Sequence, residues 1–390
     1  RSQTVTGVQT CALPISRLTV KVRDLTAQRL RAHVEVYDHR GRRVARKRRP
    51  VGSGGANRWH WRPDLPGFGW YLAKMTVRRA SAAEGSGSIA RTYGAFLWLP
   101  QAPPLPDEAG EKFGFAAEGM PADRRALLPE LMKRARLPSA VLSAWQRSDT
   151  AGGMESRQQR YSDALKPATL RSERLTMAFS PVPKALLSEA SVDRAYPLRV
   201  LAGDAETWLP YVAPALRWHG QYVKRWQLGE TGDDRPFFFP ELGQTVRQIH
   251  DRLRGLVPGP HVVLPWSLHQ PPLDELPDSV VYAIDVPPDV TARHLDQYLE
   301  AWKGGDYQYR LNLRQPPADE LAHPGRVREL VLRMVRAWEV DRPAMSIQRP
   351  WTKAFERREA ILPDPLLGVF ATTAQRLAGR RAIGRLPLDD

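Results

Sequence analysis

Two different spacings of apolar residues follow one another along the chain. From residue 17 to residue 100, apolar and polar residues alternate within short runs such as LTVKVRDL and HVEVY, which is typical of β-strands that bury one face. The turn residues of DHRGR separate two of these runs and predict a hairpin. Five to seven such strands in roughly 85 residues predict a small β-sandwich over residues 17–100.

Residues 101–111 are rich in proline, and we interpret them as a linker. Beyond them, short apolar runs alternate with amphipathic segments of helical period, and only the interval between the fifth and sixth runs lacks a helical pattern. This order predicts a (β/α)8 barrel over residues 112–390. A doubly wound open sheet is the alternative, although no glycine-rich phosphate turn follows the first strand. The eight predicted strands cover residues 112–118, 139–145, 174–180, 223–230, 261–268, 279–286, 307–313 and 342–347.

Residues 1–16 differ in origin, by our interpretation, from the rest of the chain. Residues 5–15, VTGVQTCALPI, are similar to the translation of a sequencing adapter, so we expect residues 1–16 to be foreign to the protein and to pack against nothing specific, with the native start missing. They contain Cys11, the single cysteine, so the remainder offers no disulfide, cysteine-ligated zinc site or cysteine nucleophile. The sequence contains no run of 18 apolar residues, so it predicts no membrane-spanning helix. The sequence does not determine the compartment, and an extracytoplasmic one is compatible with it.

Positive charge is concentrated in the predicted sandwich. Of a net charge of +16, residues 17–101 contribute 18 Lys and Arg against 5 Asp and Glu, with a peak at RGRRVARKRRP, residues 40–50. Such a run can bind nucleic acid. However, Arg outnumbers Lys 48 to 10 over the whole chain, and no aromatic residues are interleaved with the run as they are in single-strand binders. We therefore favour a solvated hairpin over a nucleic-acid partner.

Barrel enzymes place their sites at the carboxyl ends of the strands. We expect tryptophans there to stack on sugar rings and carboxylates to bind hydroxyl groups, while capping of the barrel core is the alternative role of each tryptophan. The residues at these ends are Glu118, Trp145, Asp149, Ser180, Glu230, Trp266, His269, Asp285, Arg314, Gln315, Arg349 and Trp351.

The run KRWQLGET, residues 224–231, resembles the strand-4 signature of retaining glycoside hydrolases with (β/α)8 barrels, Trp-Gln-x-Gly-Asn-Glu, and LLPELMKRARLPSAVLSAW, residues 127–145, resembles their first helix and second strand. The resemblance implies a carbohydrate ligand and a catalytic acid/base at the end of the fourth strand. It is incomplete, because Glu230 falls where the family has Asn and Thr231 where it has the catalytic Glu. The family's nucleophile is a Glu at the end of strand 7, where this chain has Arg314 and Gln315.

Glycoside hydrolysis requires two carboxyl groups. With Glu230 as one, the second is Glu118, Asp149 or Asp285. We give Asp285 priority, although an ion pair with Arg314 or Arg349 is an equally good role for it. The further substrate-binding candidates are Glu118, Trp145, Asp149, Trp266, His269, Arg314 and Trp351.

No other chemistry stands out. No histidine spacing indicates a metal site, Ser180 lacks a nucleophile elbow, and no cofactor is implied. The expectation is a glycoside hydrolase-like barrel that binds carbohydrate, with hydrolysis by a rearranged carboxylate pair left open. The alternative is a non-catalytic carbohydrate-binding or scaffold module of a larger protein.

Overall fold

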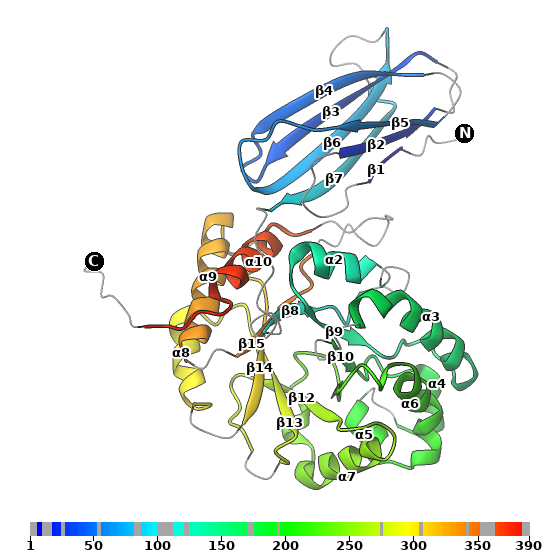
Figure 1. The fold of residues 1–390 in the computed structure, drawn as a ribbon, viewed down its shortest axis with the longest axis vertical. Helices are drawn as coiled ribbons and strands as arrows, with labels where there is room; N and C mark the ends of the chain where they lie inside the picture. The colour runs from blue at the N-terminus through cyan, green and yellow to red at the C-terminus, as the bar shows by residue number, and fades with distance from the viewer. Residues whose placement is uncertain are drawn as a thin grey trace. The chain divides into compact units, whose positions relative to one another are not determined.

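The computed structural model describes residues 6–9, 18–24, 28–52, 56–81, 87–99, 112–120, 125, 127–169, 175–192, 196–273, 276–303, 307–340, 343–351 and 363–383. The chain divides into two compact units, one of residues 1–103 and 350–368 and the other of residues 104–349 and 369–390 (Figure 1). The predicted linker, residues 101–111, lies outside the described residues, and the predicted domain limits stay predictions.

The first unit contains two antiparallel sheets whose apolar faces share one core. Alternating burial along β2 and β3 brings Val20 of one sheet and Val34 of the other into the same buried cluster, which also contains Trp59. The predicted hairpin is confirmed by the antiparallel pairing of β3 with β4. One sheet has the order β1-β2-β5 and the other β4-β3-β6-β7, with β1 Thr6–Gln9, β2 Leu18–Arg23, β3 Leu30–Asp38, β4 Arg43–Val51, β5 Ala56–Trp61, β6 Gly69–Arg79 and β7 Ala90–Trp98.

The extreme N-terminus corrects one expectation. Residues Thr6–Gln9 pair antiparallel with β2, from Thr6 opposite Val22 to Gln9 opposite Thr19. The prediction that residues 1–16 pack against nothing specific is therefore wrong for these four residues. The adapter origin of the segment is not tested by this pairing and stays a prediction.

The second unit is a closed barrel of eight parallel strands, as the alternation of apolar runs and amphipathic segments predicted, and the doubly wound sheet is excluded. The strands are β8 Phe113–Ala116, β9 Ser139–Ser143, β10 Leu175–Ala178, β11 Arg225–Gln227, β12 His261–Ser267, β13 Val280–Val286, β14 Gln308–Leu313 and β15 Ala344–Gln348. Pairing of β15 with β8 closes the ring.

Helices surround the barrel (Figure 1). They are α2 Leu128–Ala135, α3 Ala151–Thr169, α4 Lys184–Glu189, α5 Pro197–Ala202, α6 Ala205–His219, α7 Leu242–Arg254, α8 Ala292–Glu300, α9 His323–Val340 and α10 Pro365–Leu377, with a short 3-10 helix, η3, at Arg235–Phe238. No helix occurs between β12 and β13 within 268–273 and 276–279, as the sequence predicted. None of the helices in the described part of the chain is long and apolar enough to cross a membrane.

Candidate functional site at the C-terminal rim of the barrel

Because all eight strands are parallel, the residues that follow them gather at one end of the barrel. We call this end the C-terminal rim and define it by Glu118, Glu230, Asp285, Arg314 and Arg349. Glu118 lies two residues beyond β8, and Glu230 lies three residues beyond β11. Asp285 is within β13, while Arg314 and Arg349 directly follow β14 and β15.

Glu118 is buried and held by three hydrogen bonds to one of its oxygens. Its Oε1 accepts from Gln227 Nε2 at 2.7 Å, from the Thr231 backbone N–H at 2.9 Å and from Thr231 Oγ1 at 2.5 Å. Burial raises the pKa of Glu118 more than the Thr231 hydrogen bonds lower it, and the charge of Glu230 raises it further. Burial of Glu118 therefore favours its protonated form.

Gln227 extends this contact into the barrel interior. Its Oε1 accepts from Arg310 Nη2 at 2.5 Å, and Arg310 Nη1 donates to Thr176 Oγ1 at 2.7 Å. Burial lowers the pKa of Arg310 to about 10. The Gln227 amide thus fixes Glu118 at one end and a half-buried guanidinium at the other.

Glu230 forms the exposed part of the rim. Its Oε1 accepts from Arg349 Nη2 at 3.0 Å, and the two side chains are 50% and 55% exposed, so both remain accessible to a ligand. Arg349 has a φ of 43°, in the left-handed region that non-glycine residues seldom occupy. Gly119 permits the close approach of this guanidinium, because a Cβ at residue 119 would lie 3.1 Å from Arg349 Nε. Strained backbone at the end of a barrel strand is typical of functional positions.

Asp285 is engaged in the ion pair that the sequence offered as its alternative role. Its Oδ2 lies 2.7 Å from Arg314 Nε, and its Oδ1 accepts from Asn312 Nδ2 at 2.8 Å. Burial raises the pKa of Asp285 and the Arg314 charge opposes this. Gly232, with a φ of 87°, lies over the pair, since a Cβ there would be 2.3 Å from Arg314 Nη2. With both oxygens occupied, Asp285 is the less suitable partner for Glu230.

Two of the predicted sugar-stacking residues are core residues instead. Trp145 and Trp266 are both 0% exposed. The indole N–H of Trp145 donates to the Tyr211 carbonyl of α6, and the ring packs against Phe179. Trp266 packs edge-on against Tyr282. The prediction that these two rings form a surface for ligand is wrong, and the capping role is the one observed.

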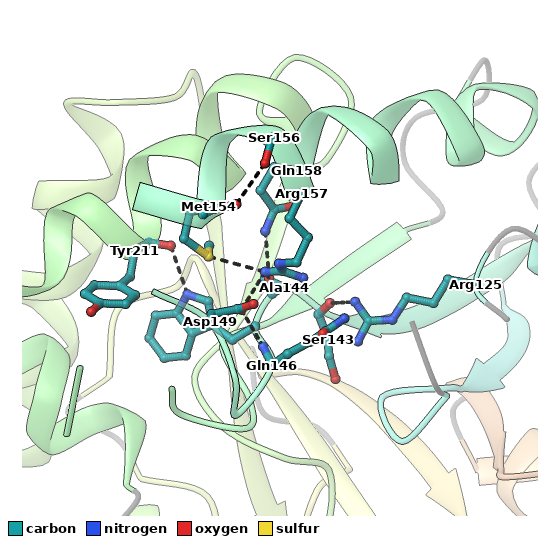
Figure 2. A network of polar contacts seen from close by, with 12 residues as sticks. Arg125, Ser143, Ala144, Gln146, Asp149, Met154, Ser156, Arg157, Gln158 and Tyr211 are labelled. Carbon is teal, nitrogen blue, oxygen red and sulfur yellow. Dashed lines mark hydrogen bonds and ion pairs between the residues drawn. The ribbon is translucent and has the colours of Figure 1, made fainter. Parts of the chain in front are cut away.

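Asp149 belongs to a different network, in the segment between β9 and α3 (Figure 2). Its Oδ2 accepts from the Gln146 backbone N–H at 2.6 Å and pairs with Arg157 Nη2 at 2.8 Å. Arg157 and Gln158 also donate to the Ala144 carbonyl. Burial raises the pKa of Asp149, and the charge of Arg157 lowers it. These contacts fasten the start of α3 to β9, which gives Asp149 a structural role.

Two further candidates, His269 and Trp351, have other contacts. His269 is exposed and packs edge-on against Tyr298 of α8. Trp351 forms an isolated bridge with Pro363 in the first unit. Within the described residues, no group of three or more His, Cys, Asp or Glu side chains could hold a metal ion.

Sequence reasoning missed one exposed ring in the loop that carries Glu230. Phe238, in η3, is 70% exposed, which is unusual for a large apolar side chain. Its neighbour Phe237 packs against Trp266 and so ties this loop to the barrel. The run RPFFFP, residues 235–240, with its three consecutive phenylalanines, was the available signal.

No protein-family model and no curated protein matches the chain. Among solved structures, a β-glucuronidase from Ruminococcus gnavus in complex with D-glucuronic acid is similar, with 9% identity and a TM-score of 0.42 over 95% of this chain and 67% of that one. A β-glucuronidase from Bacteroides uniformis is similar with 7% identity and a TM-score of 0.36, over 89% of this chain and 45% of that one. At these values the likeness supports no inference about activity. What is established is the architecture, an eight-stranded parallel barrel together with an antiparallel sandwich.

Proposed function

We propose that the C-terminal rim binds a carbohydrate in a glycoside hydrolase-type site, with Glu118 and Glu230 as its two carboxyl groups. The observation that carries the proposal is the contrast between the environments of these two side chains. Glu118 is buried with a raised pKa, Glu230 is half exposed beside Arg349, and Thr231 connects them by donating to Glu118 from the residue after Glu230. Pairs of carboxyl groups with opposed environments are typical of acid and base roles.

The hydrogen bonds of Glu118 leave one oxygen for the proton. All three described donors bind Oε1, so the proton of the neutral form belongs on Oε2. Glu230, in an ion pair with Arg349, supplies the opposite role of carboxylate. Phe238 offers an exposed aromatic face in the same loop, of the kind on which a sugar ring stacks.

One observation favours a second candidate, a non-catalytic carbohydrate-binding barrel. The end of β14 carries Arg314, which is occupied by Asp285, where the resembled family has its nucleophile. Binding through Phe238 and the Glu230–Arg349 pair requires no carboxylate at that place. The two candidates share a ligand class and differ in turnover.

The test combines turnover with binding on the full chain. Fluorogenic glycosides of neutral hexoses and of uronic acids are assayed with the wild type, Glu118→Gln and Glu230→Gln. The control is Glu300→Gln, an equal charge change at an exposed residue at the end of α8. Hydrolysis lost by at least 100-fold in both rim variants and kept in the control is the expected result, since one acid/base group contributes about 10²–10⁴-fold.

Other results separate the candidates. Hydrolysis that survives Glu230→Gln contradicts the assigned pair. A wild type that binds immobilised glycans without hydrolysing any glycoside, and loses that binding in Phe238→Ala, supports the non-catalytic candidate. Absence of both turnover and glycan binding overturns both.

A further inference from the structure

A cavity of about 360 Å³ opens at the opposite end of the barrel from the C-terminal rim. It is lined by residues at or just before the starts of the strands, among them Lys112 before β8, Ser139 of β9, Arg225 of β11 and Arg310 of β14. We call it the N-terminal cavity. Its volume is within the range of small-ligand pockets, which begins at about 300 Å³.

The described lining is strongly basic. Three cations, Lys112, Arg225 and Arg310, line the cavity, and no aspartate or glutamate is among the described lining residues. A concave site with one sign of charge and low-dielectric walls concentrates ligands of the opposite charge.

Arg310 gives the strongest indication that an anion belongs there. Its two described hydrogen bonds go to uncharged groups, Thr176 Oγ1 and Gln227 Oε1. Glu118 is reached only through Gln227. Burial lowers the pKa of Arg310 and the charge of Arg225 lowers it further, while the charge of Glu118 raises it without reversing the direction. A buried charge is unfavourable unless it is paired, and an anion in the adjoining cavity would pair it.

The arrangement of donors distinguishes between anions. Arg225 and Arg310 lie on β11 and β14 and Lys112 directly precedes β8, so the three cations are spaced around the barrel, and Ser139 and Thr176 line the cavity from two other strands. Donors that converge from several directions suit a tetrahedral dianion, with three acceptor oxygens and a charge near −2, better than a planar carboxylate. We propose that the N-terminal cavity is a binding site for a phosphate group, independent of the carbohydrate site proposed at the C-terminal rim.

The test is calorimetric titration of the full chain with inorganic phosphate at constant ionic strength, alongside thermal unfolding in phosphate and in chloride. We expect one site, and a phosphate-dependent rise in the unfolding temperature. Arg310→Gln is not the main probe, because its loss could prevent folding. Arg225→Gln and Lys112→Gln remove charges from half-buried positions, and each should weaken phosphate binding about tenfold, since a hydrogen bond to a charged group is worth roughly that factor.

Arg254→Gln, an equal charge change at an exposed residue of α7 outside the lining, is the matched control and should bind phosphate as the wild type does. Equal weakening in this control, or no binding by a folded wild type, overturns the proposal, as does tighter binding of malonate than of phosphate. A hexose 6-phosphate that binds more tightly than inorganic phosphate assigns the site to an organic phosphate. The reverse order assigns it to the free ion. No glycoside is present, so the result is independent of activity at the C-terminal rim.

Discussion

Replacing His219 should remove a specific part of the pH dependence of the barrel's stability. The ring is fully buried between α3 and α6, with Nε2 3.0 Å from Gln158 Oε1 and Tyr161 packed edge-on against it. Burial, with a smaller contribution from the charge of Arg157, lowers the pKa of His219 from 6.5 to about 4. The folded protein therefore holds this histidine neutral at pH values where the unfolded chain protonates it.

The difference in the pKa of His219 between the folded and unfolded states determines the sign and size of its effect on the free energy of unfolding. Because the folded-state pKa is the lower one, stability is unaffected at pH 7 and falls as the pH drops below 6.5, until the folded state also binds the proton near pH 4. At about 1.4 kcal/mol per pKa unit, the full loss is about 3 kcal/mol. His219→Gln abolishes this component, so the difference in unfolding free energy between variant and wild type should change by that amount from pH 7 to pH 4.

Urea denaturation at four pH values between 7 and 4 measures this difference, with the transitions of the two units fitted separately. His294→Gln, at an exposed position of α8, serves as the control for the substitution itself. Parallel stability profiles of wild type and His219→Gln across this range would refute the reasoning.

Three further changes test the rim and its surroundings by the same denaturation method. Arg314→Met should destabilise the barrel by about 2 kcal/mol at pH 7, below the usual loss for a broken buried pair because Arg314 is 39% exposed. Burial raises the pKa of Asp285, so the stability loss caused by Arg314→Met should vanish once the pH falls below the pKa of Asp285 in the folded protein, where this carboxyl group is neutral. The loss should also be absent when Arg314→Met is made in the Asp285→Asn variant. A loss that persists in that variant contradicts the ion pair. Gly232→Ala should lose about 1–2 kcal/mol through its φ of 87° and the clash with Arg314, and an unchanged midpoint would contradict the packing. Arg157→Met should lose about 3 kcal/mol by leaving Asp149 buried and unpaired, whereas a loss below 1 kcal/mol would indicate that water replaces the guanidinium.

The fold was largely predictable because each element carries its own periodic signal. The run SVVYAIDV predicted a strand at residues 279–286, and β13 is Val280–Val286. The apolar spacing in ELGQTVRQIHDRLRGL, residues 241–256, is typical of a helix, and α7 is Leu242–Arg254. Local periodicity depends on which face of an element is buried, so it is present in the sequence before any long-range contact forms.

The site was predictable only in part. That Glu118, Glu230 and Asp285 follow or end barrel strands could be read from the chain, and so could the ion pair with Arg314 as a role for Asp285. Trp145 also follows a barrel strand, but its side chain faces α6. Side chains of a strand alternate between its two faces, so a shift of one residue at the end of the strand changes which side a residue faces.

The sequence by itself determined the order and type of the elements, the basic character of the sandwich and the residues near the barrel's ends. Only the tertiary structure decided which of them meet. Strand closure brings Gln227 of β11 between Glu118, beyond β8, and Arg310 of β14, contacts that span 109 and 83 residues of chain. Sequence periodicity indicates which face of each segment is buried, but not the register in which the strands pair. That register determines which residues meet at each end of the barrel: Glu118 and its hydrogen-bond partners at one end, and the three cations at the other.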